Sequence, residues 1–182
     1  MTEIELNALV EKFPCVLKKA QNAGLVDVRK YELISKFGEA TLYRGIKRQK
    51  GMAASPLFNS DFASQAELAH HIEQEKKAIA RSMKYNVPDD LKIQMDLFNN
   101  TQMYNNFDPK KLGEYSCSFS DSYEKLESLF AKPNKGRFIA KGIVKETDGL
   151  LSRTDGTPGH IHGFLFESAN LKDSFEVLYD NP

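Results

Sequence analysis

Apolar residues recur at helical spacing in the first part of the chain. Thr2 and Glu5 can form a capping box, and Ile4, Leu6, Leu9, Val10 and Phe13 then recur every few positions. Further helices are expected over residues 14–24, which begin with proline and end with glycine, and over residues 28–37. Residues 40–46 instead combine β-branched and aromatic side chains next to glycines, which predicts a strand.

The clearest helical pattern begins at Ser64, which can form a capping box with Glu67. One face of this helix carries Leu68, Ile72, Ile79 and Met83. Pro88 ends the pattern. Residues 89–99 alternate in a way that also suits a strand, but the two aspartates at their start favour a helix, which is our expectation.

The last part of the chain is rich in strand patterns. Residues 114–119 predict a short strand, and Ser120 or Asp121 is expected to cap the helix that follows. Three further strands are expected over residues 138–144, 161–166 and 175–179. Along the chain, helices are followed by one strand, more helices and then further strands. This order predicts an α+β fold rather than an alternating parallel-sheet fold.

The length of 182 residues is typical of a single domain, and we expect one domain over residues 1–182. In this domain a helical region of about residues 1–38 packs on a mixed core of about residues 39–182. The core holds a small, mostly antiparallel sheet, and the C-terminal third is β-rich.

Charge and cysteine content narrow the classes of partner. Lysine and arginine number 25, as do aspartate and glutamate, so no overall field attracts nucleic acid or membrane. Short basic clusters such as Lys47 and Arg48 are interpreted as solvated surface, and nucleic-acid binding is not expected. Cys15 and Cys117 are too far apart in sequence for a CxxC zinc motif.

The sequence also predicts the compartment of the protein. No run approaches the twenty apolar residues of a membrane span, and the first residues lack the pattern of a signal peptide. We therefore expect a protein that is cytoplasmic in its producing cell. Secretion as an effector by a signal-independent route would leave no trace in the sequence.

Two polar patterns lie on predicted strands. Arg44, between Tyr43 and Gly45, is a long cation within an apolar strand, which suits either an anion clamp or an ion pair with a structural carboxylate. Ser116 and Ser118 share one strand face with Ser120, because side chains alternate along a strand. Their hydroxyls suit contacts to a polar ligand, or simply a polar face that runs into a helix cap.

The final candidates are two histidines and a glutamate. His160 and His162 point to the same side of a predicted strand, where they suit hydrogen bonding or proton transfer, or are structural. Two ligands do not make a zinc site, so no metal is expected. Glu167 follows an apolar run and is either a carboxylate at a strand edge or a solvated side chain.

Taken in order, the triplet with Arg44, the serine strand with its following helix, and the terminal strands resemble the mono-ADP-ribosyltransferase superfamily. The resemblance implies a split antiparallel sheet and NAD as substrate. It implies that Arg44, with Tyr43 and Gly45 beside it, holds the NAD phosphates and that Ser116 or Ser118 supports the nicotinamide ribose. It further implies a macromolecular target, as for a toxin or effector.

One part of the family pattern is missing. The paired glutamates that usually precede the closing strand are absent, and His160-Ile161-His162 occupies that stretch. The catalytic candidates are therefore His160, His162 and Glu167. The alternative is a small binding protein without catalytic activity, such as an immunity protein, an antitoxin or a phage-encoded inhibitor. The sequence leaves open which reading holds, the acceptor or partner, and the oligomeric state.

Overall fold

The computed structural model describes residues 2–34, 37–131, 136–153 and 157–179. The α-helices are α1 (Glu3–Val10), α2 (Cys15–Asn22), α3 (Gln65–Ala80), α4 (Asp89–Asn99), α5 (Gln102–Asn105) and α6 (Tyr123–Leu126). The strands are β1 (Glu39–Lys47), β2 (Cys117–Ser120), β3 (Arg137–Lys145), β4 (Gly149–Arg153), β5 (His160–Leu165) and β6 (Phe175–Tyr179). Short 3-10 and π segments are η1 (Val28–Lys30), η2 (Asn59–Phe62), η3 (Leu112–Tyr115), η4 (Glu127–Ala131) and η5 (Leu171–Asp173).

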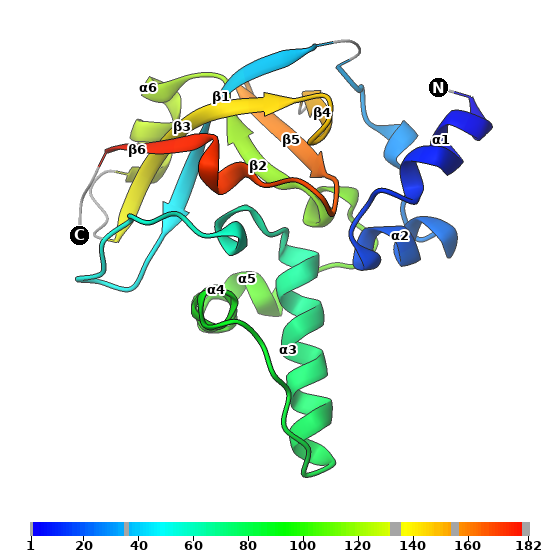
Figure 1. Cartoon of the computed structure of the whole chain (residues 1–182), viewed down its shortest axis with the longest axis vertical. Coiled ribbons are helices and arrows are strands. Elements are labelled where there is room, and N and C mark those ends of the chain that lie inside the picture. Colours follow the sequence, from blue (N-terminus) through cyan, green and yellow to red (C-terminus); the bar gives the residue numbers. More distant parts are fainter. Residues whose placement is uncertain (1, 35–36, 132–135, 154–156, 180–182) are drawn as a thin grey trace.

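The predicted α+β fold is confirmed (Figure 1). The strands form one antiparallel sheet in the order β4-β5-β2-β1-β3-β6. β1 and β3 share nine register pairs, whereas β1 and β2 share only Tyr43 with Ser120. The sheet therefore consists of two halves, β4-β5-β2 and β1-β3-β6, that are joined at a single point. Arg44 is the next residue after that junction.

Buried apolar side chains form three clusters. The largest packs both halves of the sheet against the segment around η2, and it includes the fully buried Phe138. A second cluster attaches α1 and α2 to η3 and β5, with the rings of Phe13 and Phe166 5.6 Å apart. The third joins α3 to α4. In the region predicted to be helical, about residues 1–38, the α-helices are thus α1 and α2 alone among the described residues. Both are short, and both pack against the β4-β5-β2 half.

Helix α3 is buried only near its start. Leu68 and Ile72 are buried as expected, but Ile79 is 69% exposed and Met83, beyond the helix end, is 62% exposed. The C-terminal part of α3 projects away from the sheet (Figure 1). Of the four apolar residues predicted on one face of this helix, the first two are therefore buried and the last two are not.

The predicted helix over residues 28–37 is also wrong, although residues 35 and 36 lie outside the described part. Only η1 is helical there. Leu33 forms a β-bridge with Ser152, and the Ile34 amide donates to the Leu151 carbonyl at 2.8 Å. The chain pairs here with β4, a strand that the sequence analysis did not predict. Local patterns do not reveal this pairing, because it depends on residues more than a hundred positions away.

The serine-rich segment begins later than expected. Its first residues form the 3-10 segment η3, and β2 starts only at Cys117. Ser122, rather than Ser120 or Asp121, caps α6, since its hydroxyl accepts a hydrogen bond from the Lys125 amide at 3.3 Å. Ser120 instead bonds to the backbone of Ser122, which holds the turn between strand and helix.

The start of α3 provides a first stability prediction. Ser64 is buried, its hydroxyl accepts from the Glu67 amide at 3.2 Å, and the Glu67 carboxylate accepts from the Ser64 amide at 2.8 Å. We expect Ser64→Ala to lower the free energy of unfolding by about 1 kcal/mol, because it leaves an amide of the first turn without a partner. Urea denaturation followed by circular dichroism measures this loss. Ser64→Gly should cost only a few tenths, and an equal loss in both variants would contradict the capping role.

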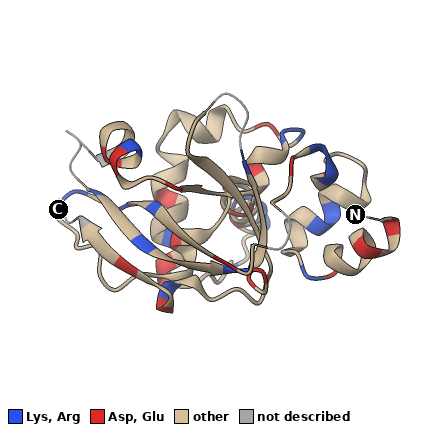
Figure 2. Cartoon of the chain, turned by 90° about the horizontal axis from the view of Figure 1, so that it is seen from above, with Lys and Arg blue, Asp and Glu red and all other residues tan. Residues whose placement is uncertain are grey.

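The surface carries both signs of charge. Lysines and arginines are distributed with aspartates and glutamates over helices and strands alike (Figure 2). Within the described residues, no helix has the length and apolar character needed to cross a membrane.

Candidate functional site

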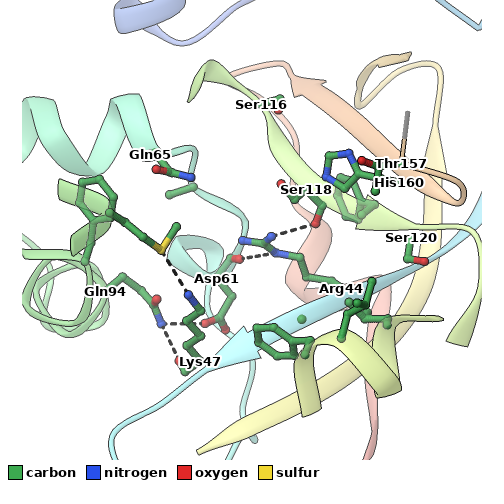
Figure 3. Close-up of a pocket in the computed structure, with 18 of the residues that line it drawn as sticks. Arg44, Lys47, Asp61, Gln65, Gln94, Ser116, Ser118, Ser120, Thr157 and His160 are labelled. Atoms are coloured by element: carbon green, nitrogen blue, oxygen red, sulfur yellow. Dashed lines mark hydrogen bonds between the residues drawn. The ribbon is translucent and has the colours of Figure 1, made fainter. Parts of the chain in front are cut away.

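A cavity of about 320 Å³ lies between the two halves of the sheet and the helices beside them. Arg44, Gly45, Ser116, Ser118 and His160 all line it (Figure 3). Arg44 and Gly45 come from β1, Ser118 from β2, Ser116 from the position just before β2, and His160 from β5. Local sequence gives no sign that β5 lies beside β2. The sheet order brings the predicted groups to one site.

Arg44 reaches the cavity at the junction of the two half-sheets. Its Nε donates to the Asp61 carbonyl at 3.1 Å, and one terminal nitrogen donates to the Ser118 carbonyl at 2.8 Å. The guanidinium thus links β1 to β2 where backbone pairing between these strands ends. Among the described residues, no carboxylate lies within ion-pair distance of Arg44. Within the described residues, Arg44 therefore does not form the ion pair with a structural carboxylate that was the alternative interpretation.

Three of the five N–H groups of Arg44 are not used in these two bonds. A half-buried guanidinium held by neutral carbonyls keeps its full positive charge uncompensated. Such a group favours an anionic ligand, because guanidinium and phosphate form charge-assisted and often bidentate hydrogen bonds. The geometry therefore favours the anion clamp.

Ser116, Ser118 and Ser120, all predicted on one strand face, have different surroundings, and Ser116 lies just before β2. Ser116 is buried and bonds to the Gly113 carbonyl at 2.8 Å and to His162 Nδ1 at 2.6 Å. Ser120 is buried in the turn before α6. Ser118 is exposed, and its hydroxyl forms no hydrogen bond within the described residues. Of the three hydroxyls, only that of Ser118 is available for a ligand.

The two histidines lie on the same side of β5, as predicted, and their rings meet edge to face at 4.6 Å. In register, His160 is opposite Ser120 and His162 is opposite Ser118. His160 lines the cavity. Burial, and then the charge of Arg44, lower the pKa of His160 below its usual value. At neutral pH this imidazole is therefore mostly uncharged and can accept a proton.

His162 lies deeper and does not line the cavity. It is only 9% exposed, its ring contacts Tyr31 and Phe164, and burial followed by the charge of His160 lowers its pKa to about 4. Because its Nδ1 is bonded to Ser116, His162 positions the strand beneath the cavity. It does not face a ligand there.

Glu167 lies away from this site. It follows the end of β5, its side chain is exposed, and its amide donates to the Lys12 carbonyl at 2.8 Å. It lines a different hollow, of about 480 Å³, between α2, α3 and the end of β5. The structure therefore does not bring Glu167 together with Arg44.

The neighbours of Arg44 also differ. Tyr43 packs edge to face on Tyr123 at 6.0 Å and does not line the cavity. Gly45 does, and a side chain there would come within 2.8 Å of the Phe130 ring. Glycine at this position lets Phe130 of η4 close over the strand as one wall of the cavity.

Sequence reasoning missed a buried ion pair beneath the site. Arg48 and Asp61 form a bidentate pair whose side chains are both fully buried. The Asp61 carboxylate also accepts from the Phe58 amide at 2.7 Å and from Gln94 at 3.1 Å. The interpretation of Lys47 and Arg48 as solvated surface is thus wrong. The signal that was available is the position of Arg48, in phase with the buried Ile46.

Lys47 lines the cavity as well. Burial, with the charges of Arg137 and Arg44, lowers its pKa to about 8. Among the described residues that line the cavity, Asp61 is the single carboxylate, and Arg48 already neutralises it. The site is consequently electropositive.

In the described residues, no three histidine, cysteine, aspartate or glutamate side chains are close enough to share a metal ion. Comparisons of the chain with protein-family models, with curated proteins and with solved structures find no match.

Proposed function

We propose that this protein binds NAD in the cavity beside Arg44 and is an ADP-ribosyltransferase-like protein that acts on a macromolecular target. The observation that carries the proposal is the convergence of Arg44, Ser118 and His160, from three strands, on one electropositive cavity. These groups appear along the chain in the order that the resemblance implies. The split of the antiparallel sheet at Arg44 also supports the proposal.

Arg44 is suited to the diphosphate of NAD. Its guanidinium is fixed by two carbonyls and has further N–H groups to donate. A cation fixed in advance loses little conformational freedom when it binds a phosphate. Ser118 is exposed, and its backbone carbonyl accepts a hydrogen bond from Arg44. Its hydroxyl would contact the ribose next to the diphosphate.

Transfer of ADP-ribose breaks the bond between nicotinamide and ribose and develops positive charge on the ribose. A nearby carboxylate stabilises that charge. The described lining offers only Asp61, which is bound by Arg48. His160, uncharged at neutral pH, can take a proton from an acceptor but supplies no negative charge. In this proposal the cavity binds NAD, and His160 serves as the base.

The same lack of a free carboxylate in the described lining favours a second candidate function. In this alternative, the protein binds a nucleotide or a partner protein without catalysis, as an immunity protein, antitoxin or phage-encoded inhibitor would. For either candidate, a protein is the expected substrate or partner, and the cytosol of the producing cell is the expected compartment.

Isothermal titration calorimetry with NAD tests the binding step. We expect Arg44→Ala to weaken NAD binding about tenfold to hundredfold, because a charged hydrogen-bond donor contributes about 1.5–3 kcal/mol. Arg29→Ala, which removes an exposed arginine paired with Asp27, should leave affinity unchanged. Release of nicotinamide measured in the same samples separates the enzyme from the binding protein.

Each outcome of this experiment has a distinct meaning. Arg44-dependent binding with nicotinamide release that His160→Gln abolishes supports the transferase. Arg44-dependent binding without release supports the non-catalytic alternative. If NAD at millimolar concentration does not bind the wild type, the NAD proposal is rejected.

A further inference from the structure

Lys47 is a second cation at the cavity that has no carboxylate partner among the described residues. It lies three positions after Arg44 on β1, so a flat strand would turn the two side chains to opposite faces. Both nevertheless line the same cavity, where the Arg44 guanidinium lies between the Asp61 and Ser118 carbonyls (Figure 3). The Nζ of Lys47 contacts the sulfur of Met103 at 3.4 Å, which is a weak acceptor.

The charges around Lys47 are mostly of its own sign. Arg137 is directly opposite it on β3, and like charges in a cross-strand pair are destabilising. Arg44 is on its own strand and Arg48 directly follows that strand, and Asp61 of η2, the nearby carboxylate, is bound to Arg48. On α4, Gln94 donates to the Lys47 carbonyl at 3.2 Å and brings no charge.

Folding therefore tolerates an unfavourable grouping of cations. Among the described residues, no carboxylate lies within ion-pair distance of the Lys47 ammonium. Its burial next to Arg44 and Arg137 favours the uncharged amine, which agrees with a pKa of about 8. An arrangement that costs stability without a partner in the fold is typical of a site whose partner is a ligand.

We propose that Lys47 and Arg44 together form a two-point anion site that takes a ligand with two adjacent anionic groups, a diphosphate. Arg44 binds one phosphate through its fork of N–H groups, and Lys47 binds the other as a point charge. This inference rests on the proposed function in using the same cavity and extends it by assigning Lys47. It requires neither nicotinamide nor catalysis.

The test uses inorganic pyrophosphate as the probe, measured by calorimetry at pH 7 with the full chain. We expect Lys47→Met to weaken binding about tenfold and Lys47→Arg to retain it, since arginine keeps the charge. The matched control is Lys145→Met, which removes an exposed lysine that pairs with Glu39 at the other end of the same two strands. It should leave pyrophosphate affinity unchanged.

Two further readouts distinguish a binding role from a structural one. In the absence of ligand, Lys47→Met should raise the melting temperature, because it removes the like-charge contact with Arg137. At pH 8, binding should take up more protons in the wild type than in Lys47→Arg, because a phosphate raises the pKa of Lys47 and arginine does not titrate. Heats measured in buffers of different ionisation enthalpy give this difference.

The failure of this inference and the failure of the NAD proposal are distinguishable. If Lys47→Met binds pyrophosphate as tightly as the wild type, or if the wild type does not bind it at millimolar concentration, the two-point site is overturned, whatever NAD does. If pyrophosphate binding depends on Lys47 while NAD fails to bind, only the NAD proposal fails. An additional titration with ADP-ribose separates the sources, since tighter binding than pyrophosphate indicates a nucleotide diphosphate.

Discussion

Replacing Arg48 with methionine is expected to lower the free energy of unfolding by about 3–5 kcal/mol, because it leaves the Asp61 carboxylate buried without its cation. Both side chains are fully buried and form a bidentate pair. The remaining donors to Asp61, the Phe58 amide and Gln94, are neutral and cannot replace the charge. Urea denaturation at pH 7 measures this loss.

Two further variants isolate the uncompensated charge. The double variant Arg48→Met with Asp61→Leu should recover most of the loss, since it removes both charges. Arg153→Met breaks a more exposed pair with Asp121 and should cost less than about 1 kcal/mol. A loss in Arg48→Met no larger than in Arg153→Met would show that the buried pair does not hold this part of the fold.

The same pair supports the candidate site. The ion pair between the Asp61 carboxylate and Arg48 holds η2 in place. It therefore also holds the backbone carbonyl of Asp61, which accepts the hydrogen bond from Arg44. We therefore expect destabilisation of this pair to reduce ligand affinity as well, even though Arg48 does not line the cavity.

Acidification is expected to destabilise the folded protein by about 3 kcal/mol through His162 alone. Its pKa is about 4 in the folded chain and about 6.5 in an unfolded one. Between these values the unfolded chain binds the additional proton, so stability falls as the pH falls from 6.5 to 4, by about 1.4 kcal/mol for each unit. Above pH 6.5 this penalty is absent, because the imidazole is neutral in both states, and below pH 4 it is complete.

His162→Gln provides the comparison, because a glutamine amide can still hydrogen-bond to the Ser116 hydroxyl and does not titrate. The loss of ring packing against Tyr31 and Phe164 lowers its stability at every pH, so the slopes are compared rather than the absolute values. Urea denaturation at a series of pH values should give a shallower acid decline for the variant. Parallel curves would contradict a neutral, buried His162.

Much of the fold could be predicted from local patterns. The capping boxes at Thr2 and Ser64 do start helices, and residues 89–99 are helical as expected. Errors arose where a distant segment competed for the backbone. The segment around Leu33 pairs with β4 instead of completing a helix, and the apolar end of α3 projects without a covering element.

For the site, sequence alone identified the residue types but not their roles. It singled out Arg44, Ser118 and His160, which the structure brings together, and also Tyr43, His162 and Glu167, which do not line the cavity. It missed Lys47, because a lysine in a short basic cluster has the same local pattern whether its side chain points to water or into a cavity.

What the sequence determined by itself is the α+β class and the position of the first candidate cation on an apolar strand, because capping, periodicity and β-branching act over a few residues. Only the tertiary structure decided which side chains meet. The partial pairing of β1 with β2 opens a gap for Arg44, and β5 beside β2 brings His160 into the cavity. These contacts join segments about 40 to 80 residues apart, and such pairing depends on burial and hydrogen bonding across the whole sheet.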